Sequence, residues 1–86
     1  MIVYRFSVIV TTSELTHEEI LRAADALADS GCTDASVRGH QEGIELMFDR
    51  AAVSLQEAMT SAISDVESAG YPVSRVEMER EALWAA

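Results

Sequence analysis

Two stretches decide the fold: THEEILRAADALADSG at residues 16–31 and SLQEAMTSAISDVESAG at residues 54–70. Each begins with a hydroxyl residue followed three positions later by glutamate, the capping box that satisfies backbone N–H groups at a helix start. Each continues with apolar residues at helical spacing. Each ends at a glycine, which readily takes the left-handed conformation that terminates helices. The sequence therefore predicts two amphipathic helices of similar length.

Segments of alternating apolar and polar residues flank both predicted helices, and this period of two is typical of strands. They span residues 2–10, 34–38, 44–49 and 73–80, with a hairpin loop at residues 39–43. The order is β-α-β-β-α-β, which predicts an α+β domain of the ferredoxin-like type. We expect a four-stranded antiparallel sheet of order 4-1-3-2 with both helices on one face. Residues 1–86 should form one domain with a short tail at residues 81–86.

The composition is acidic, with 15 acidic and 6 basic side chains in 86 residues and a net charge of −9. Every basic side chain is an arginine, and such a chain repels phosphate backbones, so direct nucleic-acid binding is disfavoured. The acidity serves either solubility or attraction to a basic partner. No apolar run approaches the roughly 20 residues that span a membrane. The single cysteine, Cys32, forms no internal disulfide, so we expect a cytoplasmic protein in which Cys32 is a small buried apolar residue.

The sequence shows no motif for catalysis, metal binding or cofactor binding. His17 and His40 are not spaced as a metal-ligand pair, and a histidine–carboxylate acid–base pair has no more support. Gly39 and Gly43 do not form a G-x-G-x-x-G loop, and there is no C-x-x-C motif. We therefore predict no catalytic residue, no metal ion and no cofactor.

The fold leaves one sheet face without helices, and we expect the following residues there: Val3, Arg5, Ser7, Ile9, Ser36, Arg38, Glu45, Met47, Asp49, Val73, Arg75, Glu77 and Glu79. RNA-binding domains of this fold need stacking aromatic residues on this face, and acidic residues exclude that function here. The face is either a solvated lattice of ion pairs or a dimer or partner interface with an apolar centre at Val3, Ile9, Met47 and Val73.

Trp84 is the single tryptophan, and it either folds back over the domain or anchors a partner. The candidate partner-binding residues are Glu45, Met47, Asp49, Arg75, Glu77, Glu79 and Trp84.

One resemblance extends over nearly the whole chain. The run ALADSGCTDA at residues 26–35 resembles the ALxxAGCxDA stretch of small bacterial proteins, and residues 48–55 and 61–70 are similar to theirs. The resemblance is to the N-terminal ferredoxin-like domain of helix-turn-helix regulators or antitoxin-type proteins. It implies dimerisation or partner binding and supplies no catalytic residue. Because the chain stops at Ala86, where such relatives begin their DNA-binding helices, we expect a stand-alone module without the DNA-binding part.

The leading hypothesis is a non-enzymatic module that binds a protein with a basic surface. Its concrete forms are an antitoxin-like protein or an inhibitor of a nucleic-acid-handling defence complex, as anti-CRISPR proteins are. One alternative is a dimeric small-molecule sensor or cofactor-free enzyme of the ferredoxin-like fold. Another is the dimerisation domain of a regulator.

Overall fold

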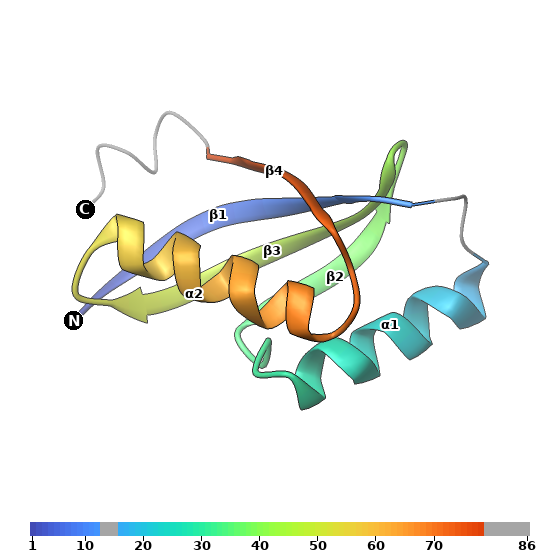
Figure 1. The fold of residues 1–86 in the computed structure, drawn as a ribbon, viewed down its shortest axis with the longest axis horizontal. Helices are drawn as coiled ribbons and strands as arrows, with labels where there is room; N and C mark the ends of the chain where they lie inside the picture. Colours follow the sequence, from blue (N-terminus) through green and yellow to red (C-terminus); the bar gives the residue numbers. More distant parts are fainter. Residues whose placement is uncertain (13–15, 79–86) are drawn as a thin grey trace.

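The computed structural model describes residues 1–12 and 16–78 of the chain. The elements are β1 (Ile2–Thr11), α1 (His17–Asp29), β2 (Ala35–His40), β3 (Gly43–Ala52), α2 (Leu55–Ser68) and β4 (Val73–Glu77). The strands form one antiparallel sheet of order β2-β3-β1-β4, which is the predicted order 4-1-3-2 read from the opposite edge (Figure 1). The predicted order of elements and strands is therefore confirmed. Within the described residues, neither helix is long and apolar enough to cross a membrane.

Both helices begin and end where the sequence predicts. At Thr16 the capping box is complete, because its hydroxyl accepts from the Glu19 N–H at 3.2 Å and the Glu19 carboxylate accepts from the Thr16 N–H at 3.3 Å. At Ser54 the structure shows the first of these two bonds, with the hydroxyl accepting from the Glu57 N–H at 3.1 Å. After both helices the chain turns at glycines of positive φ, +106° at Gly31 and +95° at Gly70.

A single apolar core lies between the sheet and the two helices. Alternate residues of β1 and β3 face it, and the rings of Phe6 and Phe48 stack with their centroids 5.5 Å apart. The helices bury mostly small side chains, Ala23 and Leu27 from α1 and Ala58, Ala62 and Val66 from α2. Because both helices contribute to the same cluster, they cover the same face of the sheet, as predicted.

The predicted position of Val73 on the helix-free face is wrong. Ile9 pairs with Arg75, but the next residue, Val10, pairs with Val73, so one extra residue lies in β4. This β-bulge turns Val73 to the same side as Val10, and Val73 packs against the core. The later positions Val76 and Met78 pack against the core as predicted.

The β2–β3 connection is shorter than the predicted loop. His40 pairs with Gly43, so Gln41 and Glu42 alone form the turn. Gly43 has φ +146°, and a Cβ there would collide with the Val10 carbonyl oxygen and the Thr12 nitrogen. Glycine is therefore required at Gly43 for both conformational and steric reasons.

Candidate protein-interaction surface

The helix-free face of the sheet brings together five of the seven predicted partner-binding residues. Cross-strand neighbours share a face in an antiparallel sheet. The register pairs Asp49 with Arg5, Met47 with both Ser7 and Ser36, Glu45 with both Ile9 and Arg38, Glu77 with Ser7, and Arg75 with Ile9. Glu79 and Trp84, the other two, lie outside the described residues. The predicted face therefore exists, and its centre is built by β1 and β3.

An exposed ion pair joins β1 and β3 on this face. Arg5 donates from Nε to Asp49 Oδ1 at 2.7 Å and from Nη2 to Oδ2 at 3.2 Å, the two-bond geometry that suits guanidinium and carboxylate. The hydrogen bond from Arg5 lowers the pKa of Asp49 below its usual value. Asp49 is therefore ionised and already has a cationic partner within the domain.

Glu45 is buried at the centre of the same face. Its carboxylate accepts from Arg38 Nε at 3.0 Å and from the Ser7 hydroxyl at 2.8 Å. Ile9, the residue paired with Glu45 on β1, is fully buried. Because Ile9 is buried and Val73 faces the core, the expected apolar centre of an interface on this face is reduced to half-buried Met47 and exposed Val3.

Arg75 completes the set of ion pairs at the β4 edge. It donates from Nε to Glu77 at 2.7 Å and from Nη2 to Glu42 in the β2–β3 turn at 2.9 Å. The hydrogen bonds that Arg75 donates to both carboxylates raise its pKa above the usual value, and the bond to Glu42 has the larger effect. The helix-free face thus corresponds to the ion-pair lattice, one of the two forms expected from the sequence.

A shallow hollow of about 440 Å³ lies in this lattice. It is lined by Arg5, Phe6, Ser7, Arg38, Glu45, Met47, Glu77 and Met78. Both of its arginines donate to carboxylates of the domain, so the hollow is close to neutral, and its lining combines polar with apolar side chains.

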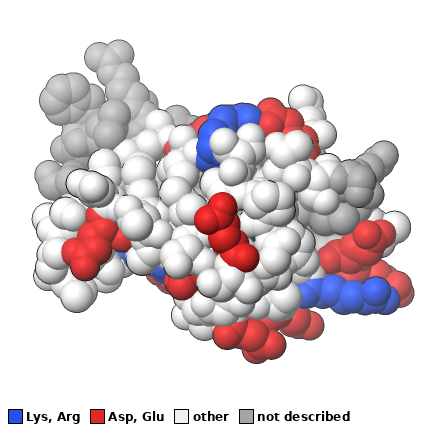
Figure 2. Space-filling view, in the orientation of Figure 1, with Lys and Arg blue, Asp and Glu red and all other residues white. Residues whose placement is uncertain are grey.

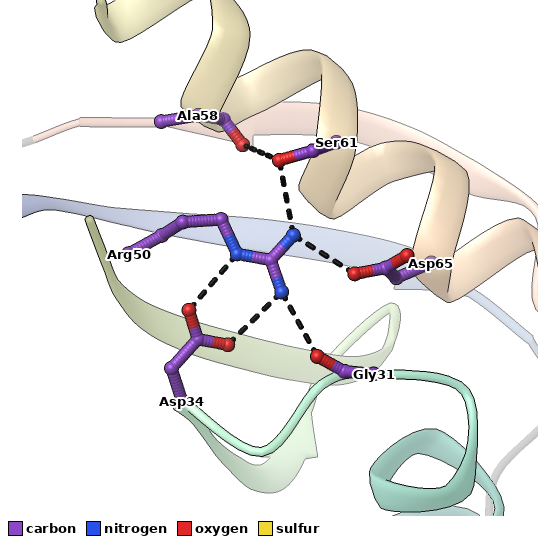
Figure 3. Close-up of polar contacts among 6 residues, drawn as sticks. All are labelled: Gly31, Asp34, Arg50, Ala58, Ser61 and Asp65. Carbon is purple, nitrogen blue, oxygen red and sulfur yellow. Dashed lines mark hydrogen bonds and ion pairs between the residues drawn. The ribbon is translucent and has the colours of Figure 1, made fainter. Parts of the chain in front are cut away.

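A second centre of charge, which the sequence did not predict, lies around the buried Arg50 of β3 (Figure 3). The Arg50 guanidinium donates two bonds to the Asp34 carboxylate at 2.9 and 3.0 Å. It donates further bonds to the Gly31 carbonyl at 3.1 Å, the Ser61 hydroxyl at 3.1 Å and Asp65 Oδ2 at 2.9 Å. All the N–H donors of the guanidinium are thereby satisfied.

The Arg50 centre has a structural role. It connects β3 to the loop before β2 and to α2, and the guanidinium also lies 4.9 Å from the centre of the Phe48 ring. The hydrogen bond from Arg50 lowers the pKa of Asp34, and burial raises the pKa of the nearby Cys32 thiol. Cys32 is a buried free thiol, which confirms the prediction that it is a small buried residue. A buried thiol of raised pKa is also a poor nucleophile.

The charges of the two layers differ. Every described arginine makes an ion pair, with Arg22 on α1 pairing to Glu18 at 3.9 Å and the others as above. The described carboxylates that pair with no described arginine all lie on exposed positions of the helices: Glu19, Asp25, Asp29, Glu57 and Glu67. Figure 2 shows blue arginine atoms beside red carboxylate atoms, whereas other red atoms stand alone among uncharged residues. The surplus negative charge of the described chain therefore belongs to the helical layer.

Groups suited to metal binding do not assemble within residues 1–12 and 16–78, where no three histidine, cysteine, aspartate or glutamate side chains gather around a common point. His17 lies exposed at the start of α1, and His40 ends β2.

Comparison with protein families, curated proteins and solved structures found no match for this chain.

Proposed function

We propose that this domain is a non-enzymatic module that binds a basic surface of another protein. The observation that carries the proposal is the segregation of charge among the described residues: their arginines are paired, and their carboxylates without an arginine partner lie on α1 and α2. A surface that carries one sign of charge attracts a partner of the opposite sign and accelerates their encounter. The helical layer is therefore the contact surface, and the sheet face plays the smaller part.

The positions of two carboxylates support this assignment. Asp29 ends α1, Glu67 lies in the last turn of α2, and neither helix has a basic residue in its last turn. A carboxylate at a helix C-terminus is unfavourable because it meets the negative end of the helix dipole. A basic partner would compensate this cost, which gives these charges a reason beyond solubility.

The biological form that we propose is an antitoxin-like protein or an inhibitor that covers the basic nucleic-acid-binding surface of a defence complex, as anti-CRISPR proteins do. We also propose that the domain is ferredoxin-like and corresponds to the N-terminal domain of the antitoxin-type regulators that its sequence resembles. Its strand order supports the fold assignment. A cytoplasmic location is part of the proposal, supported by a single cysteine that is buried as a free thiol.

The test compares three forms of the protein as bait. The helix variant carries D25N, D29N, E57Q and E67Q, and a control variant carries R5Q and D49N, which remove an ion pair from the sheet face without changing the net charge. A partner captured from lysate is identified, purified and titrated against each form at about 50 and about 500 mM salt. We expect wild-type and control proteins to lose about tenfold or more in affinity at the higher salt, and the helix variant to bind weakly at both. The proposal would be refuted if the affinity changed neither with salt concentration nor with the helix substitutions.

A second candidate function rests on the hollow of about 440 Å³ in the sheet face, which has a volume typical of small-molecule sites. In this case the domain would be a sensor or cofactor-free enzyme for a small polar ligand. Thermal shift measurements with a metabolite library test it, with Arg38→Ala as the variant that should abolish any stabilisation. An absence of stabilisation by every compound would exclude this candidate.

A further inference from the structure

Within the described part of the chain, the first half of β1 has a neighbouring strand on one side only. On the β3 side β1 is paired from Ile2 to Thr11, whereas on the β4 side the described residues pair with β1 from Ser7 to Val10. Among the described residues, no strand lies beside residues 2–6 on that second side. An unpaired strand edge offers free N–H and C=O groups to any extended chain that can reach them.

The hydrogen-bond pattern identifies which backbone groups face this edge. The Thr12 N–H donates to the Glu42 carbonyl at 2.9 Å, and the β1–β3 register continues without a break to Ile2. Residues of an antiparallel strand bond alternately to either side, so the even-numbered residues of β1 bond to β3. Val3 and Arg5 therefore direct their N–H and C=O groups to the unpaired edge.

Exposed apolar side chains gather at the same corner. The described chain has large exposed apolar residues at Met1, Ile2, Val3, Leu21 and Val53, and all except Leu21 belong to this corner. Ile2 pairs with Ala52, which places Val53 next to Met1 one residue beyond the last pair. An unpaired edge and a cluster of exposed apolar residues both mark an interaction surface, and here they coincide.

We infer that this edge binds a second copy of the chain, with β1 of each copy adding antiparallel to β1 of the other. A twofold axis at Val3 would place Val3 opposite Val3 of the second copy, and Arg5 opposite its Met1. The Met1 ammonium of one copy would then lie opposite Arg5 of the other, but Asp49 of the same chain balances the Arg5 charge, so the ammonium faces a neutral ion pair. The edge is thus complementary to itself, whereas the acidic helices would repel a second copy.

The dimer should be weak. Residues 2–6 span roughly 17 Å, and such a short edge buries less than the standard interface of about 800 Å² per partner. We expect a dissociation constant in the range of about 10 μM to 1 mM. Self-association through β1 goes beyond the proposed function and can be measured without a partner protein. Self-association and partner binding can therefore each be refuted without the other.

The test measures mass by sedimentation equilibrium from about 10 μM to about 1 mM. Wild-type protein should change from monomer to dimer across this range. Val3→Lys would set two ammonium groups opposite each other and should raise the dissociation constant about tenfold or more. Leu21→Lys is the matched control, because Leu21 is 54% and Val3 62% exposed, and it should dimerise like wild type. A wild type that remains monomeric, or a V3K variant that dimerises equally well, overturns the inference.

Amide exchange of the unmodified chain provides an independent measurement. The Val3 and Arg5 amides should exchange quickly in dilute solution and become protected as the concentration rises. If they are equally protected at the lowest concentration, where the protein is monomeric, residues of the same chain already pair with this edge and the inference is wrong.

Discussion

The Arg50 centre allows a quantitative prediction about stability. Arg50→Ala removes five hydrogen bonds and leaves the Asp34 and Asp65 carboxylates without their cation. Removing one partner of a buried ion pair costs about 3–5 kcal/mol. The Asp34 and Asp65 side chains are 31% and 33% exposed and can rehydrate, which favours the low end, about 3 kcal/mol. A chain of this length has a total stability of about 4–13 kcal/mol, so the loss is a large fraction of it.

Equilibrium unfolding in urea measures this loss. With a slope of about 1–1.5 kcal/mol per molar urea, the midpoint should fall by about 2–3 M. Arg50→Lys retains the charge but not the forked geometry and should lie between Arg50→Ala and wild type. The matched control is Arg5→Ala on the neighbouring strand, whose side chain is 66% exposed and whose ion pair is screened by solvent, so its midpoint should move far less. A midpoint for Arg50→Ala within about 0.5 M of wild type would refute the reasoning.

The pH dependence of the stability of Arg50→Ala tests the physical cause of its stability loss. Arg50 lowers the pKa of folded Asp34 below its unfolded value, so the unfolded state binds more protons in acid. The stability that the Arg50–Asp34 interaction contributes is present above the pKa of Asp34 in the unfolded chain, about 3.9. It is lost as the pH falls through the lower pKa of Asp34 in the folded protein. The stability difference between wild type and Arg50→Ala should therefore narrow below about pH 4. A constant difference would show that Arg50 stabilises the fold by packing and not through Asp34.

Three further predictions follow from local geometry. Gly43→Ala should destabilise the fold more than Gly70→Ala, because both have positive φ but only at Gly43 would the added Cβ collide with backbone atoms; equal losses in urea unfolding would contradict this. Thr16→Ala should cost about 1 kcal/mol by loss of the α1 cap, whereas Thr60→Ala on the exposed side of α2 should be neutral or slightly stabilising in the same assay. Cys32 should react slowly with a thiol reagent in the native state because burial raises its pKa, and reaction should accelerate in urea; fast native labelling would argue against a buried thiol.

The parts of the fold that were predictable from sequence depend on local patterns. The Thr16 cap, the Gly31 and Gly70 turns and the alternation in β1 each need only a few neighbouring residues, and each is present in the structure. The position of Val73 was not predictable in this way. Its side is set by a bulge in the pairing of β4 with β1, which no alternation within β4 reveals.

The Arg50 centre was missed for a different reason. Its partners come from the loop before β2 and from α2, far from Arg50 in the sequence. One signal was available: β3 continues to Ala52, so Arg50 follows Leu46 and Phe48 at an inward-facing position. An arginine at such a position requires buried hydrogen-bond acceptors. Because the predicted strand ended at Asp49, Arg50 was not assigned to an inward-facing position and no buried acceptors were sought for it.

The partner-binding surface that we propose differs from the set of residues that the sequence predicted. Glu45, Asp49 and Glu77 were candidates because acidic residues attract a basic surface, yet each is already bound by an arginine of the sheet, and a partner would have to displace that arginine. Asp29 and Glu67 face no such competition, and their places near the C-terminal ends of α1 and α2 cost stability. A variant with D29N and E67Q alone should therefore be at least as stable as wild type in urea while binding the proposed partner more weakly. This combination distinguishes charges retained for binding from charges that hold the fold, since removing the latter lowers both.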